Sequence, residues 1–233
     1  MVEIYIINMK LGVAIPCYCG HINHLFTLLD SIDSQTILPN KVVVSSSSTN
    51  SFEMKKKYSF SLEIIITGEK QNASQNRNAA ASRLLDMDYI TFFDADDIMH
   101  PERIEILLEV IKKKNSDIIL HNFYDESEHN MHMFDKIQNV FITTNSLTKS
   151  LSGCITHNKF NGLKDSKSKI HHSQVTVKKS IFEMIKFPEE TEYNEKEDCI
   201  FCYRVFSLPN VTNAYIQNKL SYYKQSSTGG HLI

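Results

Sequence analysis

The sequence has no excess of basic charge. Its 233 residues include 25 Lys and Arg against 27 Asp and Glu, which gives a formal net charge of −2. It also has no cluster of Lys and Arg interleaved with aromatic side chains, the arrangement that single-strand binders use. Nucleic acid is therefore not an expected partner.

Long uncharged hydrophobic runs are missing as well. The apolar N-terminal stretch MVEIYIINMKLGVAIP is interrupted by Glu3 and Lys10, and it lacks a basic leader and a small-residue cleavage site. We expect a strand there rather than a signal or anchor, and hence a cytoplasmic protein with no membrane span. Because 42% of the residues are hydrophobic, the chain has enough apolar material for one sizeable globular domain.

The five cysteines do not suggest a disulfide framework, since their odd number fits a reduced intracellular protein best. Cys17 and Cys19 together with Cys199 and Cys202 could in principle form a four-thiolate zinc site. However, the first pair straddles a predicted strand end and the second lies in a helix-like run. Buried free thiols are the usual alternative.

The strongest local signal is an apolar strand that runs directly into acid. Residues 89–93, YITFF, are aromatic and β-branched, and Asp94, Asp96 and Asp97 follow them. Open α/β sheets bind ligands at the carboxyl ends of their strands, and crowded carboxylates suit Mg²⁺ or Mn²⁺, which also neutralises a bound diphosphate. Taken alone, the same acids are also found in solvated turns, and here such a turn would precede the helix near Pro101.

Strand and helix patterns alternate through the first half of the chain. We expect strands at 10–16, 41–44, 62–67, 89–93 and 116–123, and helices at 22–35, 73–85 and 101–113. This alternation predicts a doubly wound, mostly parallel α/β sheet over residues 10–123.

The second half is less regular. We expect a strand at 170–177, helices at 180–186 and 198–207, and short strands at 211–217 and 219–223. Four histidines have no tight ligand spacing and are expected at the surface rather than in a second metal site: His121, His129, His132 and His157.

Polar residues follow the other predicted strands. The run SSSSTNS at 45–51 would lie beside the exit of the first strand, where a nucleotide would sit. Arg77, flanked by amide side chains near a helix start, is suited to contact a base, ribose or phosphate. In isolation an ordinary exposed arginine is equally plausible.

Together, the segments GVAIPCY, VVVSSSSTN, NRNAAAS, FFDADDIMHPER and KEDCIFCYRV resemble, in order and spacing, the nucleotide-sugar-dependent glycosyltransferases of the GT-A fold, family 2. The resemblance covers roughly residues 10–207. It implies one GT-A domain over 1–233, with a nucleotide-sugar-binding half at 10–123 and a small irregular acceptor-binding half at 124–233.

On the donor side, the resemblance implies that Pro16 and Tyr18 cradle the base and that Arg77 belongs to the donor pocket. Ser45 and Ser46 stand where the family usually has paired aspartates, one of which contacts the base. A serine can hydrogen-bond a base but supplies no charged acceptor. A UDP-sugar remains the expected donor.

The segment Asp94-Ala95-Asp96 matches the family's Asp-X-Asp signature in the donor site. The resemblance assigns Asp96 to Mn²⁺ or Mg²⁺, Asp94 to the ribose or the metal, and Asp97 to a supporting role at the metal. Residues around Gln225 offer no evident third protein ligand.

On the acceptor side, Glu197-Asp198 resembles the family's Glu-Asp pair, which makes Asp198 the expected base and Glu197 an acceptor-side partner. Without the resemblance, both acids would simply favour a helix N-terminus. His172 and Gln174 are expected to contact the acceptor, although an ordinary polar strand explains them equally well.

The expected activity is inverting, metal-dependent transfer of a hexose-like sugar to a hydroxyl of a glycan, small molecule or protein. A nucleotidyltransferase is disfavoured because CYCGH, after the first strand, has one glycine instead of a Gly-rich phosphate loop. A non-catalytic sugar-binding or nucleotide-sugar-binding module on the same fold remains the alternative.

Overall fold

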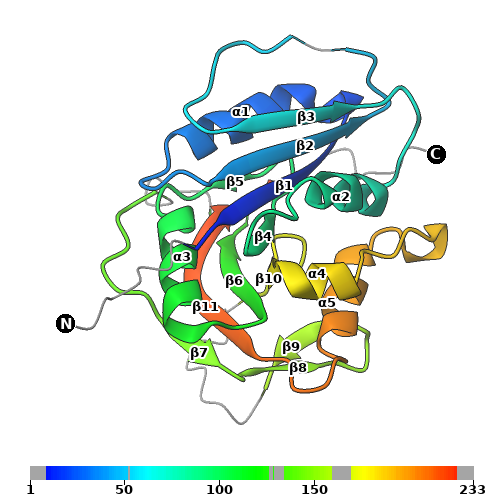
Figure 1. The fold of residues 1–233 in the computed structure, drawn as a ribbon. Helices are drawn as coiled ribbons and strands as arrows, with labels where there is room; N and C mark the ends of the chain where they lie inside the picture. The colour runs from blue at the N-terminus through cyan, green and yellow to red at the C-terminus, as the bar shows by residue number, and fades with distance from the viewer. Residues whose placement is uncertain (1–8, 52, 126–127, 129–133, 159–168, 225–233) are drawn as a thin grey trace.

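A mixed nine-stranded sheet forms the centre of this computed structural model, which describes residues 9–51, 53–125, 128, 134–158 and 169–224. The strands are β1 (Leu11–Tyr18), β2 (Lys41–Ser47), β3 (Leu62–Ile66), β4 (Tyr89–Phe92), β5 (Ile98–Met99), β6 (Ile118–Tyr124), β7 (Ile142–Thr144), β10 (Thr176–Lys178) and β11 (Asn213–Tyr222). Their order is β3-β2-β1-β4-β10-β6-β11-β5, and β7 pairs with β11 (Figure 1). The strands β8 (Leu147–Lys149) and β9 (Ile155–His157) form a separate hairpin.

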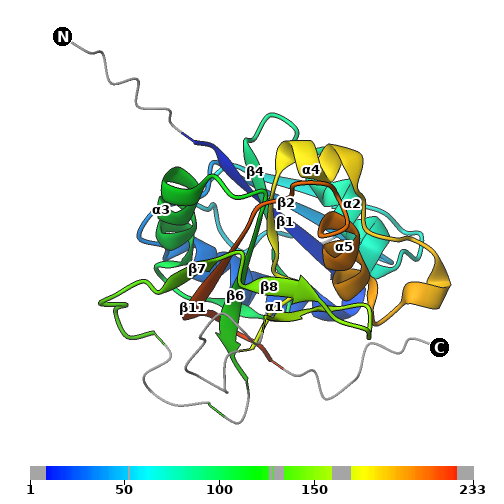
Figure 2. The same cartoon turned by 90° about the horizontal axis from the view of Figure 1, so that it is seen from below.

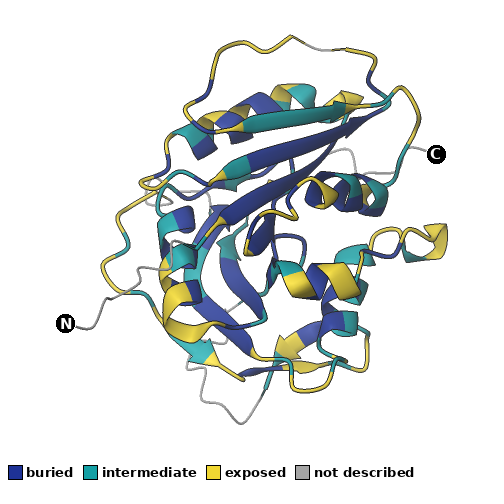
Figure 3. Ribbon diagram, viewed as in Figure 1, coloured by how far each residue is buried: buried dark blue, intermediate teal, exposed yellow. Residues whose placement is uncertain are grey.

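The strands supply two hydrophobic cores, one on each face, because successive side chains of a strand point to opposite sides. Leu11, Val13 and Ile15 of β1 pack in one core with α1 (Ile22–Asp33) and α3 (Arg103–Lys114). Ala14 belongs to the other core, with α2 (Ala73–Ser82), α4 (Lys179–Met184) and α5 (Glu197–Val205). Figures 1 and 2 show α2, α4 and α5 together on the side away from α3, and Figure 3 shows the buried strands between the layers.

The expected α/β fold class is confirmed. β1 pairs in parallel with β2 and β4, β2 with β3, and β6 with β11. The helix expected at 22–35 is present as α1, and four of its side chains are fully buried: Leu25, Leu28, Leu29 and Ile32. This arrangement brings the carboxyl ends of β1, β2 and β4 to one edge of the sheet.

The strand expected at residues 170–177 is mostly absent. Only Thr176–Lys178 is extended, as β10, which lies antiparallel between β4 and β6. The preceding residues, 170–175, form no strand and lie at the carboxyl end of β4. The strand prediction failed for residues 170–175 because their polar side chains contact one another and the acids after β4, as described below.

Other differences are smaller. The two strands expected at 211–217 and 219–223 are one strand, β11, whose pairing with β6 shifts register near Lys219. His121 was expected at the surface, but it is fully buried. His157 is half-buried, while His129 and His132 lie outside the described residues, as do the first eight residues.

All five cysteines are free thiols; Cys17 and Cys202 are buried and Cys19 is exposed. Within the described ranges, no helix combines the length and the apolar character needed to cross a bilayer.

Candidate active site

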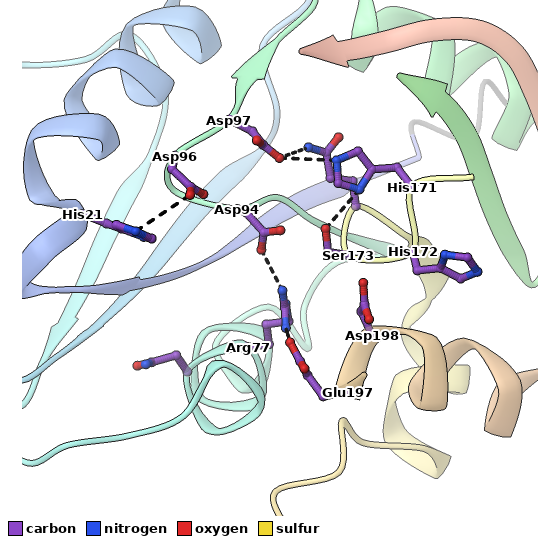
Figure 4. A network of polar contacts seen from close by, with 12 residues as sticks. His21, Arg77, Asp94, Asp96, Asp97, His171, His172, Ser173, Glu197 and Asp198 are labelled. Carbon is purple, nitrogen blue, oxygen red and sulfur yellow. Dashed lines mark hydrogen bonds and ion pairs between the residues drawn. The ribbon is translucent and has the colours of Figure 1, made fainter. Parts of the chain in front are cut away.

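A polar cavity of about 270 Å³ lies beyond the carboxyl end of β4, between the 170–173 segment and the start of α5 (Figure 4). Its lining consists of Arg77, Asp94, Phe123, Ile170, His171, His172, Ser173, Glu195, Glu197, Asp198 and Tyr223. The cavity therefore unites residues expected on the donor side with residues expected on the acceptor side.

Arg77 joins the two sides. The helix that carries it, α2, begins with a capping box in which Asn72 and Gln75 bond each other's backbone N–H. One guanidinium nitrogen of Arg77 lies 2.8 Å from Asp94 Oδ1 and the other 2.7 Å from Glu197 Oε1, with only 4% of the residue exposed. Although burial alone opposes charge on Arg77, these two carboxylates raise its pKa.

The acids of the cavity differ in their electrostatics. Burial alone would raise the pKa of Asp94, but Arg77 holds it below its usual range. The pKa of Asp198 is raised by burial, and the nearby charge of Glu197 adds to this effect although Arg77 opposes it. A carboxylate with a raised pKa and a place in a cavity is a better proton acceptor than an ordinary one.

Asp96 lies at the outer side of this cluster, facing the end of β1. Its pKa is raised by burial and by the charge of Asp94. The imidazole Nε2 of His21 lies 3.8 Å from Asp96 Oδ2 (Figure 4). His21 closes the short 3₁₀ turn Cys19–His21 that follows β1, and no motif in the sequence marks it as a site residue.

Asp97 turns into the interior. It is 1% exposed and accepts hydrogen bonds from Gln174 Nε2 at 2.6 Å and from the Lys224 N–H at 3.0 Å. The imidazole Nε2 of His171 lies 3.4 Å from the same carboxylate, at ion-pair distance. Burial raises its pKa to about 6, even though His171 opposes the shift. These contacts hold the Asp97 side chain away from the cavity lining, and its supporting role at the metal stays a prediction.

Gln174 is also fully buried and does not line the cavity. Its side chain donates a hydrogen bond to Asp97, and its contact with the acceptor stays a prediction. His172 does line the cavity, and its Nε2 lies 3.2 Å from the Ile155 nitrogen and 3.1 Å from the Ile155 oxygen. Beside it, Ser173 Oγ lies 3.1 Å from His171 Nδ1.

Two aromatic residues of the lining were missed from the sequence. Phe123 packs its ring 4.6 Å from that of His171, and Tyr223 packs at 5.4 Å. In the sequence they look like core residues, because strand ends and strand interiors share the same composition. Their positions at the carboxyl ends of neighbouring parallel strands were the available signal.

The serines expected near the nucleotide base, Ser45 and Ser46, form a buried uncharged surface, which we call the neutral wall. Pro16 pairs with Ser45 in the sheet, and Ser45 and Ser46 have no exposed surface. Ser45 Oγ donates to Asn76 Oδ1 at 3.0 Å, and Ser46 Oγ lies 2.9 Å from Thr49 Oγ1.

Tyr18 is half-buried at the end of β1, next to this wall. Ala95 is 1% exposed and packs in a hydrophobic core, so its methyl group faces away from the cavity's polar side chains.

The described residues contain no group of three or more His, Cys, Asp or Glu side chains arranged to hold a metal ion. Asp94 and Asp96 nevertheless fit a Mg²⁺ or Mn²⁺ ion, because these ions commonly take one or two protein carboxylates and complete their coordination with substrate phosphates and water. Gln225, where a third ligand was sought, lies outside the described ranges.

The fold and the motifs agree with known proteins. Over residues 13–182 the chain matches the family model described as glycosyl transferase family 2. Glycosyltransferase GlyA of Streptococcus pneumoniae is 32% identical over 127 residues, which are 53% of this chain and 18% of that protein. Glycosyltransferase GlyG of the same organism is 26% identical over 129 residues, 54% of this chain and 41% of that one. The matches thus span less than half of either relative.

Among solved structures, S. aureus TarS 1-349 in complex with UDP superposes with a TM-score of 0.68 at 19% identity, covering 94% of this chain and 61% of that one. The complex of the same protein with UDP-GlcNAc gives a TM-score of 0.69 at 17% identity, with coverages of 95% and 60%. These likenesses support the GT-A fold. Since the family model covers most of the chain, this protein belongs to glycosyl transferase family 2.

Proposed function

We propose that this protein is an inverting, metal-dependent glycosyltransferase that moves a sugar from a nucleoside-diphosphate-sugar to a hydroxyl acceptor. The observation that carries the proposal is the shared cavity. Arg77 bonds Asp94, from the donor motif, and Glu197, next to the candidate base Asp198. A donor and an acceptor held in this cavity would meet between Asp94 and Asp198.

Asp198 is the proposed base. As the acceptor oxygen attacks the anomeric carbon, its O–H proton passes to the Asp198 carboxylate. The new carbon–oxygen bond forms on the face opposite the diphosphate, and the bond from the anomeric carbon to the phosphate oxygen breaks, with its electron pair leaving on the nucleoside diphosphate. The raised pKa of Asp198 supports this role, because the carboxylate binds a proton more readily than an exposed one.

Asp96, with Asp94, is proposed to hold the cation. A bound Mn²⁺ or Mg²⁺ would supply positive charge that stabilises the leaving diphosphate. Arg77 would keep Asp94 ionised and fixed in direction, since the two groups lie 2.8 Å apart. His172, which lines the cavity near Asp198, remains a proposed acceptor contact.

A UDP-sugar is the proposed donor. Support comes from TarS, whose solved complexes contain UDP and UDP-GlcNAc. Against it stands the neutral wall of Ser45 and Ser46, which offers the base no charged acceptor.

Thermal-shift measurements with UDP-, GDP-, dTDP- and CMP-sugars, each with Mn²⁺ and with EDTA, test the proposal. A ligand at 100 times its dissociation constant adds about 2.7 kcal/mol of stability, so a true donor should stand out. One nucleotide class should stabilise the protein only with the cation, and Asp96→Ala should remove that stabilisation. If no nucleotide sugar stabilises the protein, a glycan-binding module without donor turnover becomes the better reading.

A further inference from the structure

The loop after β1 places an imidazole beside the proposed cation site. His21 Nε2 lies 3.8 Å from Asp96 Oδ2, and both side chains are partly shielded, with 20% and 17% exposure. In Figure 4 this pair stands apart from the Arg77 bridge, with His21 approaching Asp96 from the side opposite the 170–173 segment. Asp96 therefore has a nitrogen donor near it that does not belong to the Arg77 cluster.

The separation of the two atoms is informative. At 3.8 Å they are too far apart for a hydrogen bond, which requires about 3.2 Å or less. Two donors that each lie about 2.1 Å from one octahedral cation are about 3.0 Å apart when adjacent and about 4.2 Å apart when opposite. The observed separation falls between these two values, so a small movement of either side chain would let both atoms bind one cation.

The chain holds this imidazole in place. The rings of His21 and Tyr18 pack with their centres 4.2 Å apart. Gly20 makes that packing possible, since a Cβ at this position would lie 2.5 Å from the Tyr18 ring. The turn Cys19–His21 also leads directly into α1, whose buried face anchors it to the core. A donor atom fixed in this way is suited to bind an ion at little entropic cost.

We propose that His21 is a cation ligand, which joins Asp96 in holding the divalent ion of the donor diphosphate. This inference rests on the proposed function, because it assumes that Asp96 binds that ion. A nitrogen ligand has a consequence for metal choice. Mg²⁺ strongly prefers oxygen, whereas imidazole suits transition metals, so the site should favour Mn²⁺ over Mg²⁺.

Pulsed electron paramagnetic resonance of Mn²⁺ detects a directly bonded nitrogen. The purified protein is mixed with Mn²⁺ and inorganic pyrophosphate, which supplies a diphosphate without assuming a nucleotide base. We expect a ¹⁴N coupling that is lost in His21→Ala, together with a fall in Mn²⁺ affinity of about tenfold or more. His24→Ala is the matched control, since it removes an imidazole one helical turn away, 5.9 Å from the His21 ring, and should keep the coupling.

His21→Asp adds a second test. It replaces the nitrogen by oxygen and should lower the preference for Mn²⁺ over Mg²⁺ while abolishing the ¹⁴N coupling. If Mn²⁺ binds the wild-type protein without nitrogen coupling, or binds His21→Ala as tightly, the inference is overturned while the Asp96 site stands. If Asp96→Ala binds Mn²⁺ as well as the wild type does, the proposed cation site itself fails.

Discussion

Arg77 shows how much one residue can hold together. It is almost fully buried, and its two partners come from the strand end after β4 and from the first turn of α5. The sequence allowed its placement in the donor pocket, because an arginine near a helix start suits that role. The second partner, Glu197, lies 120 positions later, and a contact at that separation has no local signal in the sequence.

Arg77→Ala should therefore affect stability as well as activity. Removing one member of a buried ion pair leaves the other charge without compensation, so the free energy of unfolding should fall by roughly 3–5 kcal/mol. Urea denaturation followed by circular dichroism measures this change. Arg83→Ala is the control, since its side chain is 61% exposed and lies 3.7 Å from Glu63, and a change within about 0.5 kcal/mol is expected there.

Asp198→Asn tests the proposed base. It keeps the size of the side chain but cannot accept the proton, so kcat should fall by about 10² or more while donor affinity is retained. Steady-state kinetics and donor titration separate the two quantities. A parallel loss of donor affinity would make Asp198 a binding residue, and the exposed Glu190→Gln should behave as the wild type.

The pH dependence of kcat/KM follows from the same carboxylate. A base must be deprotonated to act, and burial raises the pKa of Asp198, so activity should be lost on acidification at a higher pH than the value of about 3.9 for an ordinary aspartate. The rate should be full above the raised pKa and fall as pH drops through it. An acid limb that remains at the ordinary value would contradict the role of burial.

At the scale of elements, the repeated strand–helix units were predictable because each carries its own periodic pattern. The helix at 101–113 and the strand at 41–44 appear close to their expected bounds, as α3 and β2. The 170–177 segment was not predictable, because its conformation depends on Asp97, which holds Gln174 from a distant part of the chain. Sequence spacing likewise does not reveal that the Asp97 side chain turns inward to Gln174 and the Lys224 N–H.

The start of α2 is a second determinant at this scale. Asn72 caps the helix through the Gln75 N–H and also donates to the Glu189 carbonyl. Asn72→Ala should lower the free energy of unfolding by about 1 kcal/mol and weaken donor binding, because Arg77 lies in the second turn of the same helix. Denaturation and donor titration check this. Asn72→Asp keeps the accepting oxygen and should recover most of the loss; an unchanged stability in Asn72→Ala would show that the cap contributes little.

At the scale of the whole molecule, the two expected halves share one sheet. β10, from the second half, lies between β4 and β6 of the first, and β11 pairs with β6 over most of its length. We therefore propose that residues 1–233 act as a single domain.

Cooperative unfolding tests this proposal. Far-UV circular dichroism and tyrosine fluorescence should report the same single urea transition, and tyrosine is the natural probe because the chain has no tryptophan. Two separated transitions would mean that the halves unfold independently.

The position of β10 also bears on how the protein is made. While the chain leaves the ribosome, the facing edges of β4 and β6 have no partner until residue 178 has been added. At ordinary elongation rates, the ribosome needs on the order of ten seconds to synthesise the chain from the end of β4 to residue 178. This time is long enough for unpaired strand edges to pair with other chains. Nascent chains should therefore depend on chaperones more than the folded protein does. Slower translation of residues 93–178 should increase aggregation.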